Sequence, residues 1–468
     1  MTPRELVQTA RSSVIEATLK ELKVPARVFD VVEGPTVTRY LVRPQGNIRV
    51  RRLEIVANDL AMNLAVSSVR VVTPVPGQPF VAIEVPNEEP EPVLLNDIHS
   101  SDEWMDSQAM LKLPLGKDIA GKTVIADLTT MPHLLVAGAT GSGKSVCLTS
   151  FITSLASENS PQQLRMVLID PKMVEMTMFN ELPHLLYDVA VKSDQAKRVL
   201  ELVVEEMEER YELLSKARKR NIASYNEDAE DPLPRIVVVI DELADLMIVG
   251  KREIEELLVR LAQLARAVGI HVIAATQRPS SDIITGLIKA NFSTRIAFMV
   301  STKVDSRVIL DQAGAEALVG RGDMLFMSPQ QQSHERIQGT FTPDSILEKV
   351  LQRWEEPTEF KSQRQEVTVE EPKAEPIHDT TWEEEIEALR EQWREQDKAR
   401  RELWDRSILP DDSDDTSESF EDVELAAADT ASPRKRGRAG RFINGLIVWL
   451  CGIALAIVIL YIVGEILL

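Results

Sequence analysis

The sequence predicts an α/β fold in which helices cover a core of parallel β-strands, with a small α+β domain before this core and a linker and one membrane-spanning helix after it. Three observations predict this architecture. Five short apolar runs alternate with long helical stretches, a glycine-rich loop directly follows the first run, and the composition changes after residue 354. The chain has 468 residues, 44% of them apolar, which is enough for about three domains and one large core.

The small α+β domain is expected within residues 1–100. Its segments alternate between helical apolar spacing and short runs of strand-forming residues separated by glycine and proline. Nothing in this domain has a catalytic pattern. In chain order, the predicted elements are a helix over residues 4–22, a hairpin of strands 26–32 and 36–42 around Gly34 and Pro35, a helix over 53–65, and short strands over 69–73 and 80–85.

The parallel sheet is expected within residues 101–354. Its strands are continuous apolar runs, which are typical of strands buried on both faces, and helical stretches separate them. Ligands of such sheets bind at the carboxyl ends of the strands, so the polar residues that follow the runs form the candidate site. The runs cover residues 133–138, 165–170, 235–241, 271–276 and 294–300.

A phosphate-binding loop follows the first run. GATGSGKS at residues 138–145 fits the pattern GxxxxGK[ST], and it opens a helix over 146–156, as the pattern requires. Backbone N–H groups and the helix N-terminus would hold the phosphates, Lys144 would reach the β and γ oxygens, and Ser145 would offer its hydroxyl to Mg²⁺. We expect ATP to be bound by Gly138, Thr140, Gly141, Ser142, Gly143, Lys144, Ser145 and Val146.

Two further strands end in polar residues that suit nucleotide hydrolysis. The run over 235–241 ends in Asp241 and Glu242, where Asp241 would hold the Mg²⁺ shell and Glu242 would polarise the attacking water. The next strand ends in Thr276-Gln277-Arg278, which places Gln277 beside the γ-phosphate as a sensor. Lys144, Glu242 and Gln277 are therefore catalytic candidates, and Ser145 and Asp241 are metal-ligand candidates.

Arg266 lies just before the strand over 271–276, off the buried stripe of a helix. A basic residue there is either solvated or delivered to the nucleotide of a neighbouring subunit. Sequence spacing alone favours the solvated interpretation.

Eight segments together show a detailed resemblance to a known family. They are GATGSGKS (138–145), IDPKMVE (169–175), EMEERY (206–211), VVVIDELADLM (237–247), LAQLARAVGIHVIAATQRP (261–279), ITGLIKAN (284–291), TRIAF (294–298) and STKVDSRVILDQAGAEALVGRGDML (301–325). Over residues 5–354 the chain closely resembles the motor of the FtsK/SpoIIIE family of DNA translocases. The resemblance implies a RecA-like P-loop NTPase core, the family's β domain, preceded by its small α domain.

The resemblance also implies an assembly and a substrate: a homohexameric ring that threads double-stranded DNA and steps along it by hydrolysing ATP. By motif, Arg266 resembles an arginine finger acting in trans. Arg278 with Lys289, and Lys303 with Arg307, resemble the channel residues that touch DNA phosphates. Such contacts grip DNA without reading its sequence.

The charge distribution agrees with a local DNA contact. The net charge of −21 excludes a generally basic nucleic-acid coat. Most of the imbalance lies in residues 355–430, with 26 acidic and 9 basic residues, so we expect 355–433 to be a mostly disordered linker with an amphipathic helix near 382–406. Two distant cysteines, Cys147 and Cys451, exclude a disulfide scaffold, and Cys147 is expected to be buried and unreactive.

A membrane anchor is expected within residues 434–468. Residues 442–464 form a 23-residue apolar segment in which Asn444 is the one strongly polar residue, long enough to cross a bilayer. Five basic residues precede it, which places the motor in the cytoplasm, tethered to the inner membrane by a single pass. The amino-terminus has no secretory signal pattern. The basic residues are Arg434, Lys435, Arg436, Arg438 and Arg441.

The sequence departs from the usual family pattern at both ends, and it leaves the partners and two alternative functions open. FtsK-like proteins usually carry amino-terminal membrane helices and a winged-helix γ domain, whose expected absence here puts guidance by DNA sequence and recombinase activation in doubt. Recombinase or division-protein partners, and the kind of DNA moved, stay open. The alternative functions are a secretion or conjugation coupling ATPase and a noncatalytic membrane scaffold, and Glu242 and Arg266 argue against the scaffold.

Overall fold

The structure is a computed structural model that describes residues 3–45, 52, 55–73, 80–329, 334–354 and 367. The chain divides into two units, Met1–Lys373 and Ala374–Leu468, and the second lies wholly outside the described residues. The predicted linker helix (382–406) and membrane helix (442–464) also lie outside them. Within the described ranges, no helix is long and apolar enough to span a membrane.

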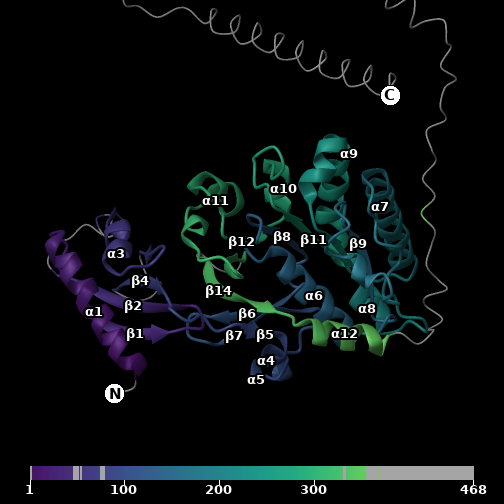
Figure 1. Cartoon of the computed structure of the whole chain (residues 1–468). Helices are drawn as coiled ribbons and strands as arrows, with labels where there is room; N and C mark the ends of the chain where they lie inside the picture. Colours follow the sequence, from purple (N-terminus) through teal and green to yellow (C-terminus); the bar gives the residue numbers. More distant parts are fainter. Residues whose placement is uncertain are drawn as a thin grey trace, which may run out of the picture. The chain divides into compact units, whose positions relative to one another are not determined.

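The described residues of the amino-terminal part form a four-stranded antiparallel sheet with two helices, as the sequence predicts (Figure 1). The strand order is β1-β2-β4-β3, and Ile15, Leu19 and Leu60 of the helices pack with Tyr40 and Ile83 of the sheet. The elements are α1 (Pro3–Glu21), β1 (Ala26–Glu33), β2 (Val37–Pro44), α3 (Ala57–Asn63), β3 (Arg70–Val72) and β4 (Val81–Pro86).

The five apolar runs form neighbouring parallel strands of a larger sheet, which confirms the prediction for this part of the fold. Their order is β12-β8-β11-β10-β9, and every neighbouring pair is parallel. The carboxyl ends of these strands therefore lie at one edge of the sheet. The strands are β8 (His133–Ala137), β9 (Leu164–Ile169), β10 (Arg235–Ile240), β11 (Ile270–Thr276) and β12 (Thr294–Phe298).

The sheet continues beyond β12 with antiparallel strands, so the predicted parallel core is one part of a mixed sheet. The order continues β13-β14-β6-β7, with β5 paired to β14 in parallel. In β6 and β14, Gly, Pro, polar and charged residues interrupt the apolar character, so the pattern typical of buried parallel strands is missing there. They are β5 (Val93–Leu94), β6 (Lys112–Asp118), β7 (Thr123–Asp127), β13 (Asp323–Met327) and β14 (Glu335–Phe341).

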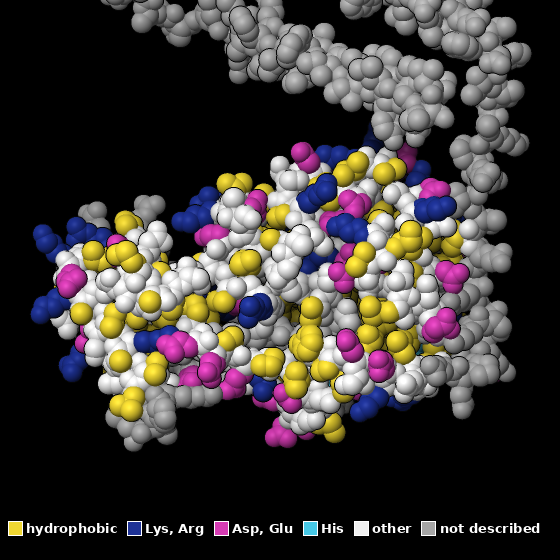
Figure 2. Space-filling view, in the orientation of Figure 1, with side chains coloured by type: hydrophobic (Ala, Val, Ile, Leu, Met, Phe, Trp, Pro, Cys, Tyr) yellow, Lys and Arg dark blue, Asp and Glu magenta, His cyan; other side chains and the backbone are white. Residues whose placement is uncertain are grey.

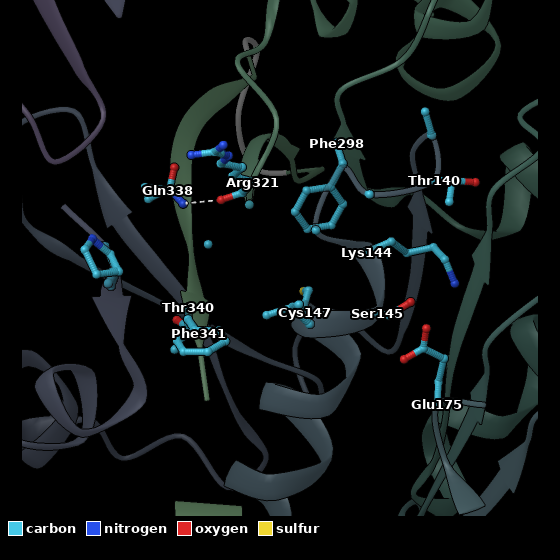
Figure 3. Close-up of a pocket in the computed structure, with 18 of the residues that line it drawn as sticks. Thr140, Lys144, Ser145, Cys147, Glu175, Phe298, Arg321, Gln338, Thr340 and Phe341 are labelled. Atoms are coloured by element: carbon cyan, nitrogen blue, oxygen red, sulfur yellow. Dashed lines mark hydrogen bonds between the residues drawn. The ribbon is translucent and has the colours of Figure 1, made fainter. Parts of the chain in front are cut away.

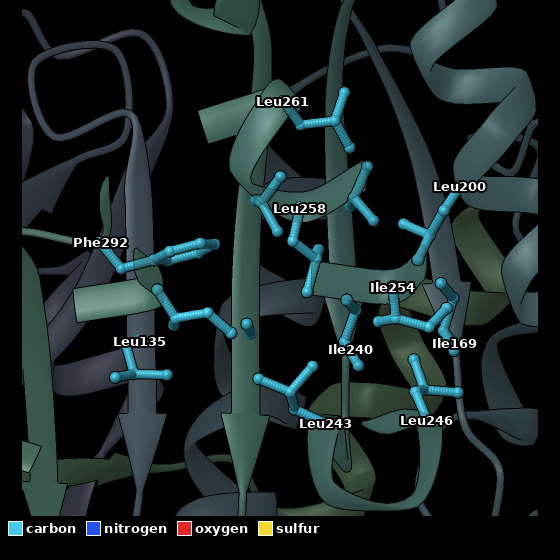
Figure 4. Packing of buried hydrophobic residues seen from close by; sticks show 14 of the residues in the cluster. Leu135, Ile169, Leu200, Ile240, Leu243, Leu246, Ile254, Leu258, Leu261 and Phe292 are labelled. Carbon is cyan, nitrogen blue, oxygen red and sulfur yellow. The ribbon is translucent and has the colours of Figure 1, made fainter. Parts of the chain in front are cut away.

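Helices cover both faces of the parallel strands, and each face has its own core. The main helices are α6 (Lys144–Glu158), α7 (Ser193–Lys216), α9 (Leu243–Leu264) and α12 (Asp344–Arg353). Along β8, Leu135 and Ala137 face the core shared with α7 and α9, whereas Leu134 and Val136 face the core shared with α6. Figure 4 shows the first core, in which Ile254 of α9 packs with residues of the strands.

Shorter elements complete the described part of the chain. They connect the strands and, at the upper side of Figure 1, place α10 and α11 on the same side of the sheet as α9. The elements are α4 (Leu95–His99), α5 (Asp102–Asp106), η1 (Thr177–Phe179), α8 (Ile222–Asn226), η2 (Ala265–Val268), α10 (Gly286–Asn291), α11 (Lys303–Leu310) and η3 (Ala315–Ala317).

A buried ion network joins the small sheet to the large one. The carboxylate of Glu84 on β4 accepts hydrogen bonds from Arg39, Arg70 and Arg336, and Arg336 on β14 also donates to both carboxylate oxygens of Asp323. Burial alone would raise the pKa of Glu84, but the three arginines hold it well below its usual range. This network couples the two sheets.

Candidate nucleotide site

The polar residues predicted to form a site meet at the carboxyl edge of the parallel strands. The glycine-rich loop leaves β8 and enters α6, Asp241 and Glu242 follow β10, and Thr276 ends β11, which lies between β8 and β10. The parallel register therefore brings together segments that are about a hundred residues apart in the sequence.

The phosphate loop is braced by a neighbouring turn. Gly143 caps α6 with a left-handed φ of +117°, and a Cβ atom there would lie 2.5 Å from the backbone nitrogen of Gly322. The same Gly322 N–H donates a hydrogen bond of 2.8 Å to the carbonyl oxygen of Ser142. Only glycine fits both the conformation and the contact at position 143.

A cavity of about 470 Å³ opens beside the loop. Figure 3 shows Lys144, Ser145 and Glu175 at one end, with Gln338 and Phe341 on the opposite side of Cys147. Its size suits a small organic ligand. Of the predicted nucleotide-binding residues, the cavity is lined by Thr140, Gly141, Gly143, Lys144, Ser145 and Val146, whereas Gly138 and Ser142 are not among its lining residues.

Lys144 and Asp241 form a buried ion pair. The Lys144 ammonium donates to Asp241 Oδ1 at 2.5 Å and to the Asp241 carbonyl oxygen at 2.7 Å. The lysine and aspartate side chains are 2% and 0% exposed. Asp241 Oδ2 is buried and has no hydrogen-bond partner among the described residues, so this oxygen retains capacity for a cation or a bound water.

Within the described residues no cluster of three or more His, Cys, Asp or Glu side chains could hold a metal ion by itself. The unengaged oxygen of Asp241, together with the Ser145 hydroxyl at the start of α6, still suits a hard divalent cation that keeps most of its water or phosphate ligands. The donor set thus fits Mg²⁺ brought with a nucleotide.

Glu242 is fully buried and both of its carboxylate oxygens are engaged. Oε1 accepts from the Thr276 hydroxyl at 2.7 Å and from the Gln277 N–H at 3.1 Å. Oε2 accepts from the Lys172 ammonium at 2.8 Å and, at 3.3 Å, from the same Gln277 N–H. Burial would raise the pKa of Glu242, but the hydrogen bonds and the charge of Lys172 lower it overall.

Lys172 is a site residue that sequence reasoning missed. It lies in the loop after β9, where its backbone N–H donates to the buried carboxylate of Asp170, and it belongs to the IDPKMVE segment. The sequence does carry a signal, because Asp170 and Lys172 follow the carboxyl end of a parallel strand in the same way as Asp241 and Glu242.

Gln277 is one of the residues that line the cavity. The Thr140 hydroxyl of the phosphate loop donates to Gln277 Oε1 at 2.8 Å, which links the loop to the end of β11. A movement of the phosphate loop would therefore act directly on Gln277 at the end of β11 through this hydrogen bond.

Arg266 lies at the opposite edge of the sheet. It sits in η2, before β11 begins, and its side chain is exposed. Burial lowers the pKa of His133, at the start of β8, to about 3, and the charges of His271 and Arg266 add to this shift. The length of β8, roughly 15 Å, separates this edge from the phosphate loop of the same chain.

The four predicted DNA-contacting residues do not share one environment. Arg278, Lys303 and Arg307 are exposed, and Lys303 and Arg307 both belong to α11. Lys289 on α10 instead pairs with Asp311 at 2.7 Å, and Asp311 also pairs with Arg295. On the face drawn in Figure 2, basic and acidic side chains of the described residues are interspersed.

Cys147 is buried beneath the phosphate loop, and burial raises the pKa of its thiol. The predicted burial of this residue is confirmed, and the raised pKa disfavours the thiolate, which is the reactive form of cysteine.

The phosphate loop, the acidic strand end at Asp241 and the sheet that places them side by side define a P-loop NTPase with a motor fold. Residues 94–281 match the FtsK/SpoIIIE family, and residues 2–87 match the FtsK alpha domain. The chain belongs to the FtsK/SpoIIIE family.

Two relatives illustrate the likeness. The chain is 48% identical over 362 residues to the DNA translocase FtsK of Caldanaerobacter subterraneus subsp. tengcongensis, covering 77% of this chain and 51% of that protein. It is 45% identical over 381 residues to the DNA translocase FtsK of Haemophilus influenzae, covering 76% of this chain and 72% of that protein. The chain thus spans about half the length of the first of these curated relatives.

Among solved structures, the chain resembles the pCW3 conjugation coupling protein TcpA, in its monomer form with ATPγS. The TM-score is 0.52 at 24% identity, covering 74% of this chain and 99% of that one. This structural similarity shows that the two chains share a fold.

Proposed function

We propose that the chain is an ATP-driven translocase of double-stranded DNA. The observation that carries the proposal is the buried pairing of Lys144 with Asp241 beside Glu242, at the edge where the phosphate loop opens onto a cavity. A strand end with two adjacent buried acids at a phosphate loop suits hydrolysis of a nucleotide and not only its storage. The relatives named DNA translocase FtsK support DNA as the substrate.

In the proposed reaction, ATP lies in the cavity with its phosphates on the loop. Lys144 leaves Asp241 for the β and γ oxygens, and Gln277 senses the γ-phosphate. Ser145 and Asp241 would hold Mg²⁺, which would supply positive charge beside the phosphate oxygens. Glu242 orients the attacking water and accepts its proton.

We propose that the pocket is completed in trans within a homohexameric ring. Arg266 lies at the edge away from its own phosphate loop and is exposed, so its side chain can reach the pocket of an adjacent copy. A guanidinium supplied to the γ-phosphate would stabilise the charge of the transition state.

DNA would be gripped by Arg278, Lys303 and Arg307, with Lys289 joining once it leaves Asp311. A few inward cations per subunit, repeated around a ring, suffice to hold a polyanion despite a net charge of −21. We further propose the domain limits 1–100, 101–354, 355–433 and 434–468. The apolar segment over 442–464 would tether the motor to the inner membrane.

The test is ATP turnover by the purified chain with and without duplex DNA. We expect duplex DNA to raise the rate of ATP turnover. Lys144→Ala should abolish this turnover, and Glu242→Gln should lower it by about 10²- to 10⁴-fold. If duplex DNA does not change the rate of ATP turnover by the wild-type chain at low and moderate salt, the result would contradict the proposal.

A further inference from the structure

The carboxylate proposed to orient the attacking water has no free position for that water. Protein donors occupy both Glu242 oxygens: Thr276 donates to Oε1, Lys172 donates to Oε2, and the Gln277 N–H is shared between Oε1 at 3.1 Å and Oε2 at 3.3 Å. A carboxylate that orients water must offer one oxygen to it at hydrogen-bond distance. Thr276 and the Gln277 N–H belong to the strand end and cannot leave, so the removable donor is Lys172.

A second acceptor lies next to Lys172. Asp245, in the first turn of α9, places its Oδ2 at 4.0 Å from the Lys172 ammonium, which is 2.8 Å from Glu242 Oε2. Both Lys172 and Asp245 are partly exposed, at 36% and 26%, whereas Glu242 is fully buried. A short movement of the lysine would therefore exchange one carboxylate for the other without leaving the ammonium unpaired.

The loop that carries Lys172 is anchored from its inner side. The Asp170 carboxylate accepts from the backbone N–H groups of Lys172, Glu175 and Met176 at 3.2, 2.9 and 2.9 Å. The outer side exposes Met173, which has a left-handed φ of +55°, a strained conformation for a residue with a side chain. Strain beside an ion pair is expected where a segment has two arrangements.

We propose that Lys172 is a positioning residue that holds Glu242 in the resting subunit and moves to Asp245 when the site turns over. The inference rests on the proposed ATP hydrolysis and adds a regulatory step to it. With Lys172 on Glu242, water is kept from the carboxylate. With Lys172 on Asp245, Glu242 Oε2 keeps only the long contact of 3.3 Å with the Gln277 N–H and can accept a hydrogen bond from water, while Thr276 still holds Oε1 in place.

The test compares ATP turnover, with and without duplex DNA, for Lys172→Met, Asp245→Asn and the double variant. Lys172→Met should raise turnover without DNA by about ten- to a hundredfold, the effect of removing one hydrogen bond to a charged group, and leave the KM for ATP unchanged. Asp245→Asn should lower the DNA-stimulated turnover, because the displaced lysine loses its second acceptor. The double variant should behave as Lys172→Met alone.

The controls separate this inference from a general loss of structure. Lys216→Met removes a lysine from an exposed pair with Glu212 and should change nothing, and Lys172→Arg should restore the low rate without DNA. A fall in turnover for Lys172→Met with unchanged KM, or an effect of Asp245→Asn that persists in the double variant, would overturn the inference. Should wild type show no turnover at all, the proposed function itself fails.

Discussion

At the residue scale, the candidate site pairs two buried acids with two lysines, of which Lys144 is buried and Lys172 is partly exposed. Lys144 forms an ion pair with Asp241, and Lys172 forms one with Glu242, so each acid has a lysine partner in this arrangement. Charges at a buried site are costly unless they are paired, so each lysine needs a new partner when it leaves its acid: the nucleotide phosphates for Lys144 and Asp245 for Lys172. The proposed cycle consists of such exchanges.

The exposed cations of α11 give the first prediction. Lys303→Ala and Arg307→Ala should each weaken duplex binding with no preference for sequence, because phosphate contacts carry no base information. Each should also reduce the slope of log affinity against log salt by about one. Binding titrations between about 50 and 200 mM salt measure both effects.

Lys289→Ala is the control for Lys303→Ala and Arg307→Ala, because it also removes one cation, but one that is already paired. Lys289 is paired with Asp311, so its removal should cost less affinity than loss of either exposed cation. Equal and large losses for all three variants would mean that the Lys289 pair opens on DNA, and no loss for any of them would contradict the proposed grip.

The site residues that the sequence predicts are those that follow an apolar strand as part of a pattern. Lys144, Asp241 and Gln277 follow such strands, and the structure brings them together. Lys172 also follows a strand, yet a lysine in a loop has many possible partners, and only the fold shows that it reaches Glu242. The pairing of Glu84 with Arg336, 252 residues apart, has no local signal.

At the element scale, the phosphate loop depends on its contact with the turn at Gly322. Gly143→Ala should abolish nucleotide binding, because its Cβ would collide with the Gly322 backbone at 2.5 and 2.7 Å. Gly141→Ala also requires a left-handed φ, of +75°, but its Cβ would meet no described atom within 4 Å, and it should cost only about 1–2 kcal/mol of stability. Nucleotide titration and thermal unfolding of both variants separate the steric collision expected for Gly143→Ala from the backbone strain expected for Gly141→Ala. Equal nucleotide binding by the two variants would contradict the proposed collision.

The link between the two sheets predicts a pH dependence of stability. Glu84→Gln leaves Arg336 and Arg70 with a neutral partner and should cost about 3–5 kcal/mol near neutral pH. The pKa of Glu84 is lowered in the folded state, so its stabilisation is full above the unfolded value of about 4.3 and is lost as the pH falls toward the folded value.

The stability gap between wild type and Glu84→Gln should therefore narrow once the pH drops below about 4. Urea unfolding near neutral pH and at about pH 3.5 measures the gap. A gap that stays constant over this range would show that the carboxylate charge is not what holds the two sheets together.

The elements that the sequence predicts well are strands buried on both faces. The five parallel strands are continuous apolar runs, and the sequence predicts each of them. β6 contains Pro114 and Gly116, and in β14 only Ile337 and Phe341 are large apolar residues, so neither strand has such a run. At Gly116 a Cβ would lie 1.9 Å from the Gln338 carbonyl oxygen, a long-range reason for glycine that the local sequence does not reveal.

At the scale of the whole molecule, the proposed function joins an ATP site to movement along DNA. The site occupies one edge of the sheet, Arg266 the opposite edge, and the exposed cations lie on α11 and after β11. A single subunit therefore does not combine all of these groups at one place, and the proposed ring supplies the missing arginine to each pocket.

The most direct test of movement along DNA is displacement of a third strand from a duplex. A triplex-forming strand annealed to linear duplex DNA reports a motor that passes through its position. We expect ATP-dependent release by the wild-type chain, none by Lys144→Ala, and slower release by Lys303→Ala. Duplex-stimulated ATP turnover that leaves the third strand in place would contradict movement along DNA.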